Sequence, residues 1–211
     1  MTGDRNSFPV WKRAMDVGLS IPTLILISPF LLIVAAVIKL VSPGPALLKQ
    51  QRIGRNGRPF SIWKFRTMCV GADSGPHVEH FNKLVRTGRP MSKLDVKRDP
   101  RIFPFGRLLR QSCIDELPQL INVLCGEMSL VGPRPSLPYE AHHFHDSEKY
   151  RFFAMPGMTG LWQVSGKNKT TFAEMARLDV QYTKTVSFFL DLKILFKTIP
   201  AIVRSRTESV A

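Results

Sequence analysis

The strongest constraint on the fold is an uncharged apolar segment near the N-terminus, which runs from Val17 to Ile38. At ~1.5 Å of rise per residue, a helix of this length reaches ~33 Å, which is enough to cross the hydrocarbon core of a bilayer. The apolar run is too long for a cleaved signal peptide, and no small-residue cleavage site follows it before Lys39. We therefore expect a membrane-associated helix that remains part of the protein.

Pro29 interrupts this helix near its middle, directly after Ser28. A proline at this position removes one backbone donor and clashes with the carbonyl of Ile25. In lipid the freed carbonyl needs another partner, and the Ser28 hydroxyl is the nearest candidate. Pro22 adds an earlier weak point. The break at Ser28 and Pro29 fits either a kinked spanning helix or a re-entrant helix that returns to the same face of the membrane.

The charges on the two sides of the apolar segment favour the re-entrant form. Basic residues lie on both flanks: Arg5, Lys12 and Arg13 before it, and Lys39, Lys49, Arg52, Arg55 and Arg58 after it. By the positive-inside rule both flanks are typical of cytoplasmic ends. Asp16, at the membrane edge, is expected to pair with Lys12 or Arg13 as a structural anchor. We expect residues 1–42 to form the membrane-associated part and residues 43–211 a cytoplasmic domain.

The overall charge indicates anionic partners. Lys and Arg number 30 against 16 Asp and Glu, which gives a formal net charge of +14, and the 44% hydrophobic content is too high for a disordered basic tail. The three cysteines, Cys69, Cys113 and Cys125, have neither metal-ligand spacing nor an even count, which favours a reducing compartment. No recognised nucleic-acid-binding motif is present, so nucleic acid is not expected as a partner.

A β-hairpin is predicted after the membrane segment. Asn56 and Gly57 form a strong signal for its turn, and the alternation over residues 60–63 indicates the strand that follows. Lys64 and Arg66 are two residues apart, so they would project from the same side of this strand. Two neighbouring cations form a candidate phosphate seat, and a solvated basic face is the alternative.

Two adjacent carboxylates, Asp115 and Glu116, open an apolar helical pattern. A helix that begins at either residue places Pro118 in its first turn, where no backbone donor is needed, whereas a start at Ser112 would put the proline in the interior at a cost of ~3 kcal/mol. The buried face of this helix is then predicted to contain Leu117, Leu120, Ile121 and Leu124, and Gly126 is predicted to end the helix. The orphan N–H groups of a helix start favour an ionised Asp115 and attract phosphate. A simple capping role for Asp115 is the alternative.

Further cations and a glycine-rich loop add to the candidate site. Arg110 lies in a basic helical segment, and Arg134 is held between two prolines, which suits bidentate phosphate binding. In the loop that follows Met155, Gly157, Thr159 and Gln163 are candidates for close approach to a nucleotide and for hydrogen bonds to its base. The nearby histidines His142, His143 and His145 have no spacing that places all three on one face, so a metal site there is the weaker interpretation.

The C-terminal segment is predicted to be helical from Phe172 onward. Apolar residues share one face of its last part: Phe188, Leu192, Leu195, Ile199 and Ile202, with Lys193, Lys197 and Arg204 off that face. Such a helix fits either the core or the membrane interface, and the N-terminal membrane segment and the basic surface favour the interface.

Taken in order, these segments resemble the bacterial sugar transferase family, the monotopic polyprenyl-phosphate phosphoglycosyl transferases. The resemblance is carried by residues 12–16, the apolar segment broken at Ser28-Pro29, Lys64-Phe65-Arg66-Thr67-Met68, Asp99-Pro100-Arg101, and residues 115–120, 126–135 and 156–164. These stretches cover nearly the whole chain, and the general look is closest to exopolysaccharide-initiating members. Met155 departs from the pattern, because family members often carry a basic residue there.

The resemblance implies a mostly helical α+β fold, with a broken membrane helix, a small cytoplasmic catalytic domain, a short β-hairpin and interfacial helices. It also implies transfer of a hexose-1-phosphate from a UDP-sugar to undecaprenyl phosphate with release of UMP. Asp115 is then the nucleophile, forming a phosphosugar-aspartate intermediate, and Glu116 helps as acid or base or positions the lipid phosphate. Lys64, Arg66, Arg110 and Arg134 would hold phosphates.

Cofactor, location and partners are also implied by the resemblance. Mg²⁺ offsets the diphosphate charge, with the Asp115 carboxylate as its protein contact. The site is expected at the cytoplasmic face of the bacterial inner membrane, with the lipid bilayer as a partner and a homodimer left open. Galactose and glucose are the sugars suggested by analogy. A membrane-tethered nucleic-acid binder and an inactive scaffold of the same fold are the alternatives.

Overall fold

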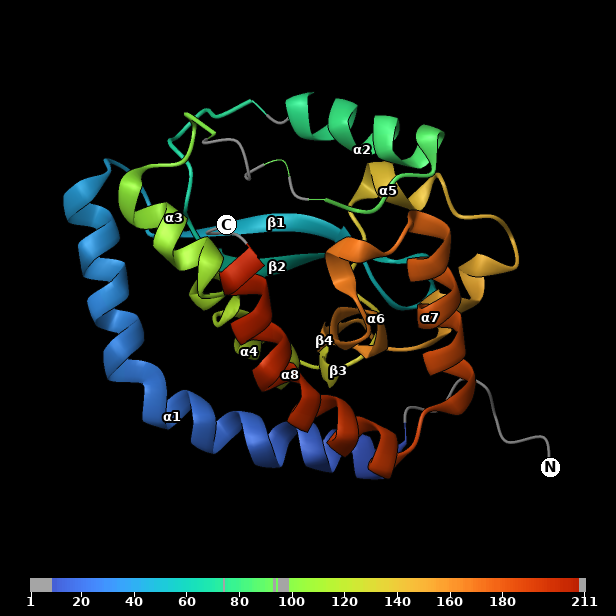
Figure 1. Ribbon diagram of the computed structural model, residues 1–211. Helices are drawn as coiled ribbons and strands as arrows, with labels where there is room; N and C mark the ends of the chain where they lie inside the picture. Colours follow the sequence, from blue (N-terminus) through green and yellow to red (C-terminus); the bar gives the residue numbers. More distant parts are fainter. Residues whose placement is uncertain (1–8, 74, 93, 95–98, 209–211) are drawn as a thin grey trace.

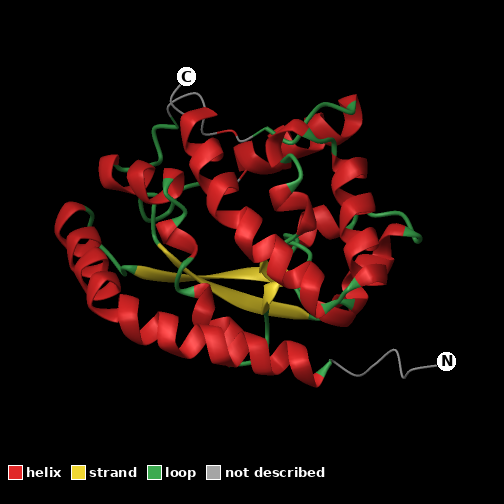
Figure 2. Cartoon of the chain, turned by 60° about the horizontal axis from the view of Figure 1, so that its bottom comes forward, coloured by secondary structure: helices red, strands yellow, loops and turns green. Residues whose placement is uncertain are grey.

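A long N-terminal helix curves around a body of shorter helices and two small sheets (Figures 1 and 2). The computed structural model describes residues 9–73, 75–92, 94 and 99–208; Arg5, part of the predicted basic flank, lies outside these residues. The expected mostly helical α+β fold is confirmed. The long helix is α1 (Val10–Val41).

The predicted β-hairpin is confirmed. Strand β1 (Leu47–Ile53) pairs antiparallel with β2 (Pro59–Phe65). The connection is a short 3-10 turn, η1 (Arg55–Gly57), in which Asn56 and Gly57 have φ of 56° and 71°. These left-handed conformations are the ones that Asn and Gly adopt most readily, which explains why the local sequence identifies the turn.

A second, parallel pair of strands lies at the centre of the body (Figure 1). It consists of β3 (Ser129–Val131) and β4 (Gly157–Thr159). The remaining elements are α2 (Gly75–Thr87), α3 (Pro104–Gln111), η3 (Ile114–Glu116), α4 (Gln119–Leu124), α5 (Pro138–Ala141), η4 (Glu148–Phe153), α6 (Leu161–Val164), η5 (Lys167–Lys169), α7 (Phe172–Thr185) and α8 (Phe188–Glu208).

Helix α1 bends in its middle but remains continuous through Pro22 and Pro29 (Figure 1). The Ser28 hydroxyl donates to the Ile25 carbonyl at 2.9 Å, as predicted for the carbonyl that Pro29 displaces. The most apolar window of α1 has a mean hydropathy of 2.8 and is only 11% buried, so within the described chain it is the one helix long and apolar enough to cross a membrane. Such low burial is not expected of a helix from the core of a soluble protein.

The first turns of α1 are tied to the body by buried polar contacts, but the predicted partners of Asp16 were wrong. Asp16 Oδ1 accepts from the Leu130 N–H at 2.9 Å, in the middle of β3. Lys12 Nζ lies 2.5 Å from an Asp191 carboxylate oxygen on α8, and Arg13 donates to backbone carbonyls at the end of α4. Each charge therefore bonds to another element rather than to its neighbour on α1, because all three residues face the packed body.

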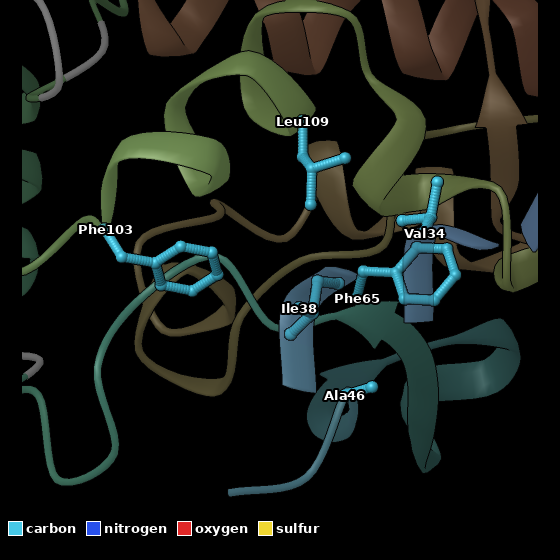
Figure 3. Packing of buried hydrophobic residues seen from close by; sticks show 6 residues of the cluster. All are labelled: Val34, Ile38, Ala46, Phe65, Phe103 and Leu109. Atoms are coloured by element: carbon cyan, nitrogen blue, oxygen red, sulfur yellow. The ribbon is translucent and has the colours of Figure 1, made fainter. Parts of the chain in front are cut away.

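The last turns of α1 pack on the same body through an apolar cluster (Figure 3). Its members come from α1, β2 and α3 and from the residues directly before β1 and α3: Val34, Ile38, Ala46, Phe65, Phe103 and Leu109. Burying a large apolar side chain stabilises the fold by ~1.5–3 kcal/mol, so this cluster holds the returning half of α1 firmly. Both ends of α1 are thus docked, while its middle carries exposed apolar residues such as Ile25 and Leu26.

Helix α8 presents its apolar residues in two directions, which corrects the single face predicted from the sequence. Ile194 is buried in the body, and Leu195 packs against the same cluster. The apolar residues left exposed are Phe188, Phe189, Phe196, Ile199, Ile202 and Val203. The packed side follows Asp191 rather than Phe188, because Asp191 bonds to Lys12 and Tyr182 inside the body. The side chain of Arg204 lies outside the described residues.

Candidate active site

Asp115 and Glu116 lie in the short 3-10 turn η3, between α3 and α4. The α-helix was predicted to begin at one of these residues, but α4 begins at Gln119 with Pro118 as its N-cap. Cys113 has a left-handed backbone, with φ of 58°, and this turns the chain between α3 and η3. Asp115 is buried, with 8% of its surface exposed. The carboxylates therefore precede the helix rather than form its first turn.

The orientation of α4 differs from the predicted stripe. Leu120 is buried as expected, but Ile121 is on the exposed side and Val123 is fully buried. We attribute this rotation to Asn122, whose side chain bonds to the backbone of β2. Its amide nitrogen donates to the Ser61 carbonyl at 2.8 Å, and its amide oxygen accepts from the Trp63 N–H at 2.9 Å. These bonds hold α4, and η3 before it, against β2. Gly126, with φ of 78°, follows the helix end as predicted.

Glu116 and Lys64 form the centre of the candidate site. Lys64 Nζ, from β2, lies 3.2 Å from Glu116 Oε1, with side-chain exposures of 17% and 46%. Burial acts to raise the pKa of Glu116, but the charges of Lys64, Lys167 and Arg134 outweigh it and lower this pKa to about 2. Glu116 is therefore ionised at neutral pH, and the charges that stabilise its ionised form come from three separate segments.

Arg134 comes from the loop after β3, and Lys167 from the turn η5. Arg134 Nη1 lies 3.4 Å from Glu140 Oε1; burial acts to lower the pKa of Arg134, but Glu140 and Glu116 raise it. Lys167 was missed as a site residue from the sequence. The available signal was a lysine directly after Gly166 in the glycine-rich segment, where a close approach of backbone to ligand is common.

Arg66, predicted to form a phosphate seat with Lys64, is bonded to the chain that follows α1. Its guanidinium donates to the Ser42 hydroxyl and carbonyl at 2.6 and 2.7 Å and to the Pro45 carbonyl at 2.6 Å. Strand β2 ends at Phe65, and the Arg66 N–H donates to the Ala46 carbonyl at 2.8 Å. Arg66 instead fixes the chain where α1 ends. Arg110 lies on α3, which packs against η3, and its guanidinium bonds to the Thr67 hydroxyl at 3.4 Å.

The three candidates from the glycine-rich loop are engaged in packing. A Cβ on Gly157 would lie 2.0 Å from the backbone nitrogen of Gly132, so glycine is required there by the close contact of two backbones. The Thr159 hydroxyl lies 2.8 Å from that of Thr198 on α8. Gln163 donates to the Met158 carbonyl at 3.3 Å. The structure thus gives all three a role in joining β4 to its neighbours.

The described residues contain no group of three or more His, Cys, Asp or Glu side chains that could hold a metal ion. His143 bonds to Asn82 at 3.0 Å. Mg²⁺ usually takes one or two protein carboxylates and completes its shell with water and substrate phosphates, so a smaller donor set suits it. Asp115, in the same turn as Glu116, is the carboxylate predicted to make such a contact.

Comparison with protein families matches residues 7–205 to the family described as bacterial sugar transferase. The exopolysaccharide production protein ExoY of Rhizobium meliloti is 40% identical over 199 residues, which cover 92% of this chain and 86% of that protein. A UDP-glucose:undecaprenyl-phosphate glucose-1-phosphate transferase of Caulobacter vibrioides is 41% identical, over 91% of this chain and 69% of that protein. An undecaprenyl-phosphate galactose phosphotransferase of Salmonella typhimurium is 39% identical, over 92% of this chain and 40% of that protein.

Proposed function

The chain belongs to the bacterial sugar transferase family, and from this membership we propose that it transfers a hexose-1-phosphate from a UDP-sugar to undecaprenyl phosphate. The names of its relatives support the reaction class. The observation that carries the proposal is the pair Asp115 and Glu116, with Lys64 in contact with Glu116. The charges of Arg134 and Lys167 also help to lower the pKa of Glu116. Such a cluster of cations beside a carboxylate suits a diphosphate substrate.

In the first step, an Asp115 carboxylate oxygen attacks the β-phosphorus of the UDP-sugar. The bond from that phosphorus to the bridging oxygen breaks, and its electron pair leaves with UMP. Lys64, Arg134 and Lys167 stabilise the charge that develops on the phosphate oxygens. The product of this step is a sugar phosphate bonded to Asp115.

In the second step, a phosphate oxygen of undecaprenyl phosphate attacks the same phosphorus. The bond to Asp115 breaks, the carboxylate is restored, and the sugar leaves on an undecaprenyl diphosphate. Two successive displacements replace one difficult displacement and give ping-pong kinetics. Mg²⁺, held by the Asp115 carboxylate and substrate phosphates, would supply charge neutralisation at the diphosphate.

Glu116 serves this reaction as an ionised positioning group. A carboxylic acid with a pKa of about 2 carries no proton to donate at neutral pH and is a weak base. Its contact with Lys64 fixes where the ammonium lies relative to Asp115. The proposed role is therefore to order the cations for the incoming phosphates.

The proposed location is the cytoplasmic face of the bacterial inner membrane. The exposed apolar middle of α1 and the exposed apolar residues of α8 support contact with the bilayer, where undecaprenyl phosphate resides. The relatives named for exopolysaccharide production support a place at the start of glycan synthesis. A re-entrant α1 would put both docked ends on one side of the membrane.

The test is to incubate the purified protein with UDP-glucose or UDP-galactose and Mg²⁺, with and without undecaprenyl phosphate. We expect UMP release, and without acceptor a gain in protein mass equal to one hexose phosphate. Asp115→Asn should abolish both, while Asp146→Asn, at an exposed acid paired with Lys149, should leave both unchanged. Release of UDP would indicate an ordinary glycosyltransferase, absence of any product would favour a scaffold, and full activity of Asp115→Asn would refute the nucleophile.

A further inference from the structure

We propose that Arg151 and Arg52 form a buried clamp that positions Arg134 for phosphate binding. Both arginines bond to the backbone of the loop at residues 132–136, and Arg134 lies in the middle of that loop. The inference rests on the proposed function, because Arg134 needs a fixed position only if it holds a substrate. Neither arginine is placed in contact with the substrate, so their role is positioning.

Arg151, in η4, bonds to this loop through two of its guanidinium nitrogens. Its Nη2 donates to the Arg134 carbonyl at 2.8 Å, and its Nη1 donates to the Ser136 hydroxyl. The same guanidinium is paired with Asp179 on α7, at 3.1 Å from Nε and 2.6 Å from Nη2 to one carboxylate oxygen. Arg151 is 2% exposed and Asp179 is fully buried. The loop is thereby tied to the buried side of α7.

Arg52, on β1, bonds to the carbonyl of the next loop residue, Pro135. Its Nη1 donates to the Pro135 carbonyl at 3.0 Å, and its Nη2 to the Gln50 side chain at 2.9 Å. Arg52 is 4% exposed, and within the described part of the chain it forms no salt bridge with a carboxylate. Burial, together with the nearby charge of Arg134, lowers the pKa of Arg52 to about 10. A buried cation without a contacting anion is costly, which fits a functional use better than a stabilising one.

Backbone bonds hold only the two ends of this loop: the Gly157 N–H donates to the Pro133 carbonyl and the Ile53 N–H to the Ser136 carbonyl, both at 2.8 Å. Pro133 and Pro135 have no backbone N–H, so two of its residues offer no donor to a neighbouring strand. Carbonyl acceptors remain, and the two guanidiniums satisfy those of Arg134 and Pro135. With its backbone held in this way, the Arg134 side chain pairs with Glu140, and its charge lowers the pKa of Glu116. The positive charges of Arg52 and Arg134 repel, and a bound phosphate would relieve that repulsion.

The kinetic test compares Arg151→Met, Arg151→Lys and Arg52→Met with Arg134→Ala in the UMP-release assay. We expect Arg151→Met and Arg52→Met to lower kcat/KM by about 10- to 100-fold through misplacement of Arg134, mainly as a higher KM for the UDP-sugar. Combined with Arg134→Ala, each should add little further loss, since the clamp acts through Arg134. Arg151→Lys should restore part of the loss. Arg177→Met, at an exposed arginine of α7, is the matched control and should behave as the parent.

Hydrogen exchange provides a readout that does not depend on activity. Arg52→Met should speed amide exchange at residues 132–137 while the thermal midpoint stays near the parent value, and Arg177→Met should not. The clamp would be refuted if the loss of kcat/KM in Arg151→Met or Arg52→Met added fully to the loss in Arg134→Ala. It would also be refuted if amide exchange in this loop were the same in Arg52→Met as in the parent. If Arg151→Met does not fold, Arg52→Met and Arg151→Lys still decide. If the parent protein releases no UMP, the proposed function fails, and exchange alone then tests the clamp.

Discussion

At the residue scale, the site depends on the ionisation of Glu116. The folded protein holds the pKa of this carboxyl at about 2, below its ordinary value of 4.5. A depressed pKa contributes stability above the unfolded value, and that contribution is lost as the pH falls toward 2. Across pH 5–9 Glu116 therefore does not titrate, and the pH–activity profile should contain no step from it. Glu116→Gln should lower the rate without changing the shape of the profile, and an acid limb lost only in this variant would contradict the assignment.

Lys64 allows a sharper test, because the same hairpin provides a control. Lys64→Met removes the cation nearest Glu116, and we expect kcat/KM to fall by about 100-fold, as for the loss of one fixed charge at a transition state. Lys49→Met, on β1 and 4.5 Å over the ring of Trp63, removes a lysine of the same sheet away from Glu116. Its activity should stay within about twofold of the parent. Equal losses in the two variants would indicate a general effect of hairpin charge.

The site residues that could be predicted were those whose position follows from local sequence. Lys64 was assigned correctly to a strand because Asn56 and Gly57 define the turn before it. The bonds that Arg66 makes were not predicted, because nothing in the local sequence indicates that the Ser42 hydroxyl lies within reach of its guanidinium. Lys167 acts on the pKa of Glu116 through its charge from a segment distant in sequence, and only the tertiary fold reveals that the two are near each other.

At the element scale, the returning half of α1 is held by apolar packing. Ile38 is fully buried between the hairpin and α3, whereas Leu40, two residues later, is 85% exposed. Ile38→Ala should lower the free energy of unfolding in detergent by ~2–4 kcal/mol through the lost contacts and the cavity that remains. Leu40→Ala should change it by less than ~0.5 kcal/mol. Denaturant titration of both variants checks the difference, and similar midpoints would mean that α1 does not dock in solution.

The element boundaries show where periodicity stops being informative. The start of α4 was predicted too early because the carboxylates and Pro118 fit a first turn, while the left-handed backbone at Cys113 could not be foreseen. The buried side of α4 is set by Asn122, a polar residue that a hydrophobic pattern ignores. In α8, the side that packs on the body follows the buried pair of Asp191 and Lys12. In both helices the packed side is set by a specific polar bond that the apolar pattern does not show.

At the scale of the whole molecule, the parallel pairing of β3 with β4 brings together segments whose proximity could not be predicted from the sequence. The hairpin was predictable because its strands are neighbours, but β3 and β4 are joined only after α5 and η4 intervene. Asp16 and Lys12 bond to residues of β3, and the loop with Arg134 follows the same strand. The start of α1 and the loop that carries Arg134 are thus connected through one short strand.

This arrangement predicts that both ends of α1 lie on one side of the membrane. The ends dock on a single body, so a spanning helix would have to give up either the Lys12 contacts or the cluster around Ile38. In a background with serine at Cys69, Cys113 and Cys125 that still releases UMP, the variants Val10→Cys, Val41→Cys and Leu26→Cys change exposed positions of α1. An impermeant maleimide should label the two end positions in inside-out vesicles but not in intact spheroplasts, and should not label position 26 from either side. Labelling of the two ends from opposite sides would establish a spanning helix and reject the re-entrant form.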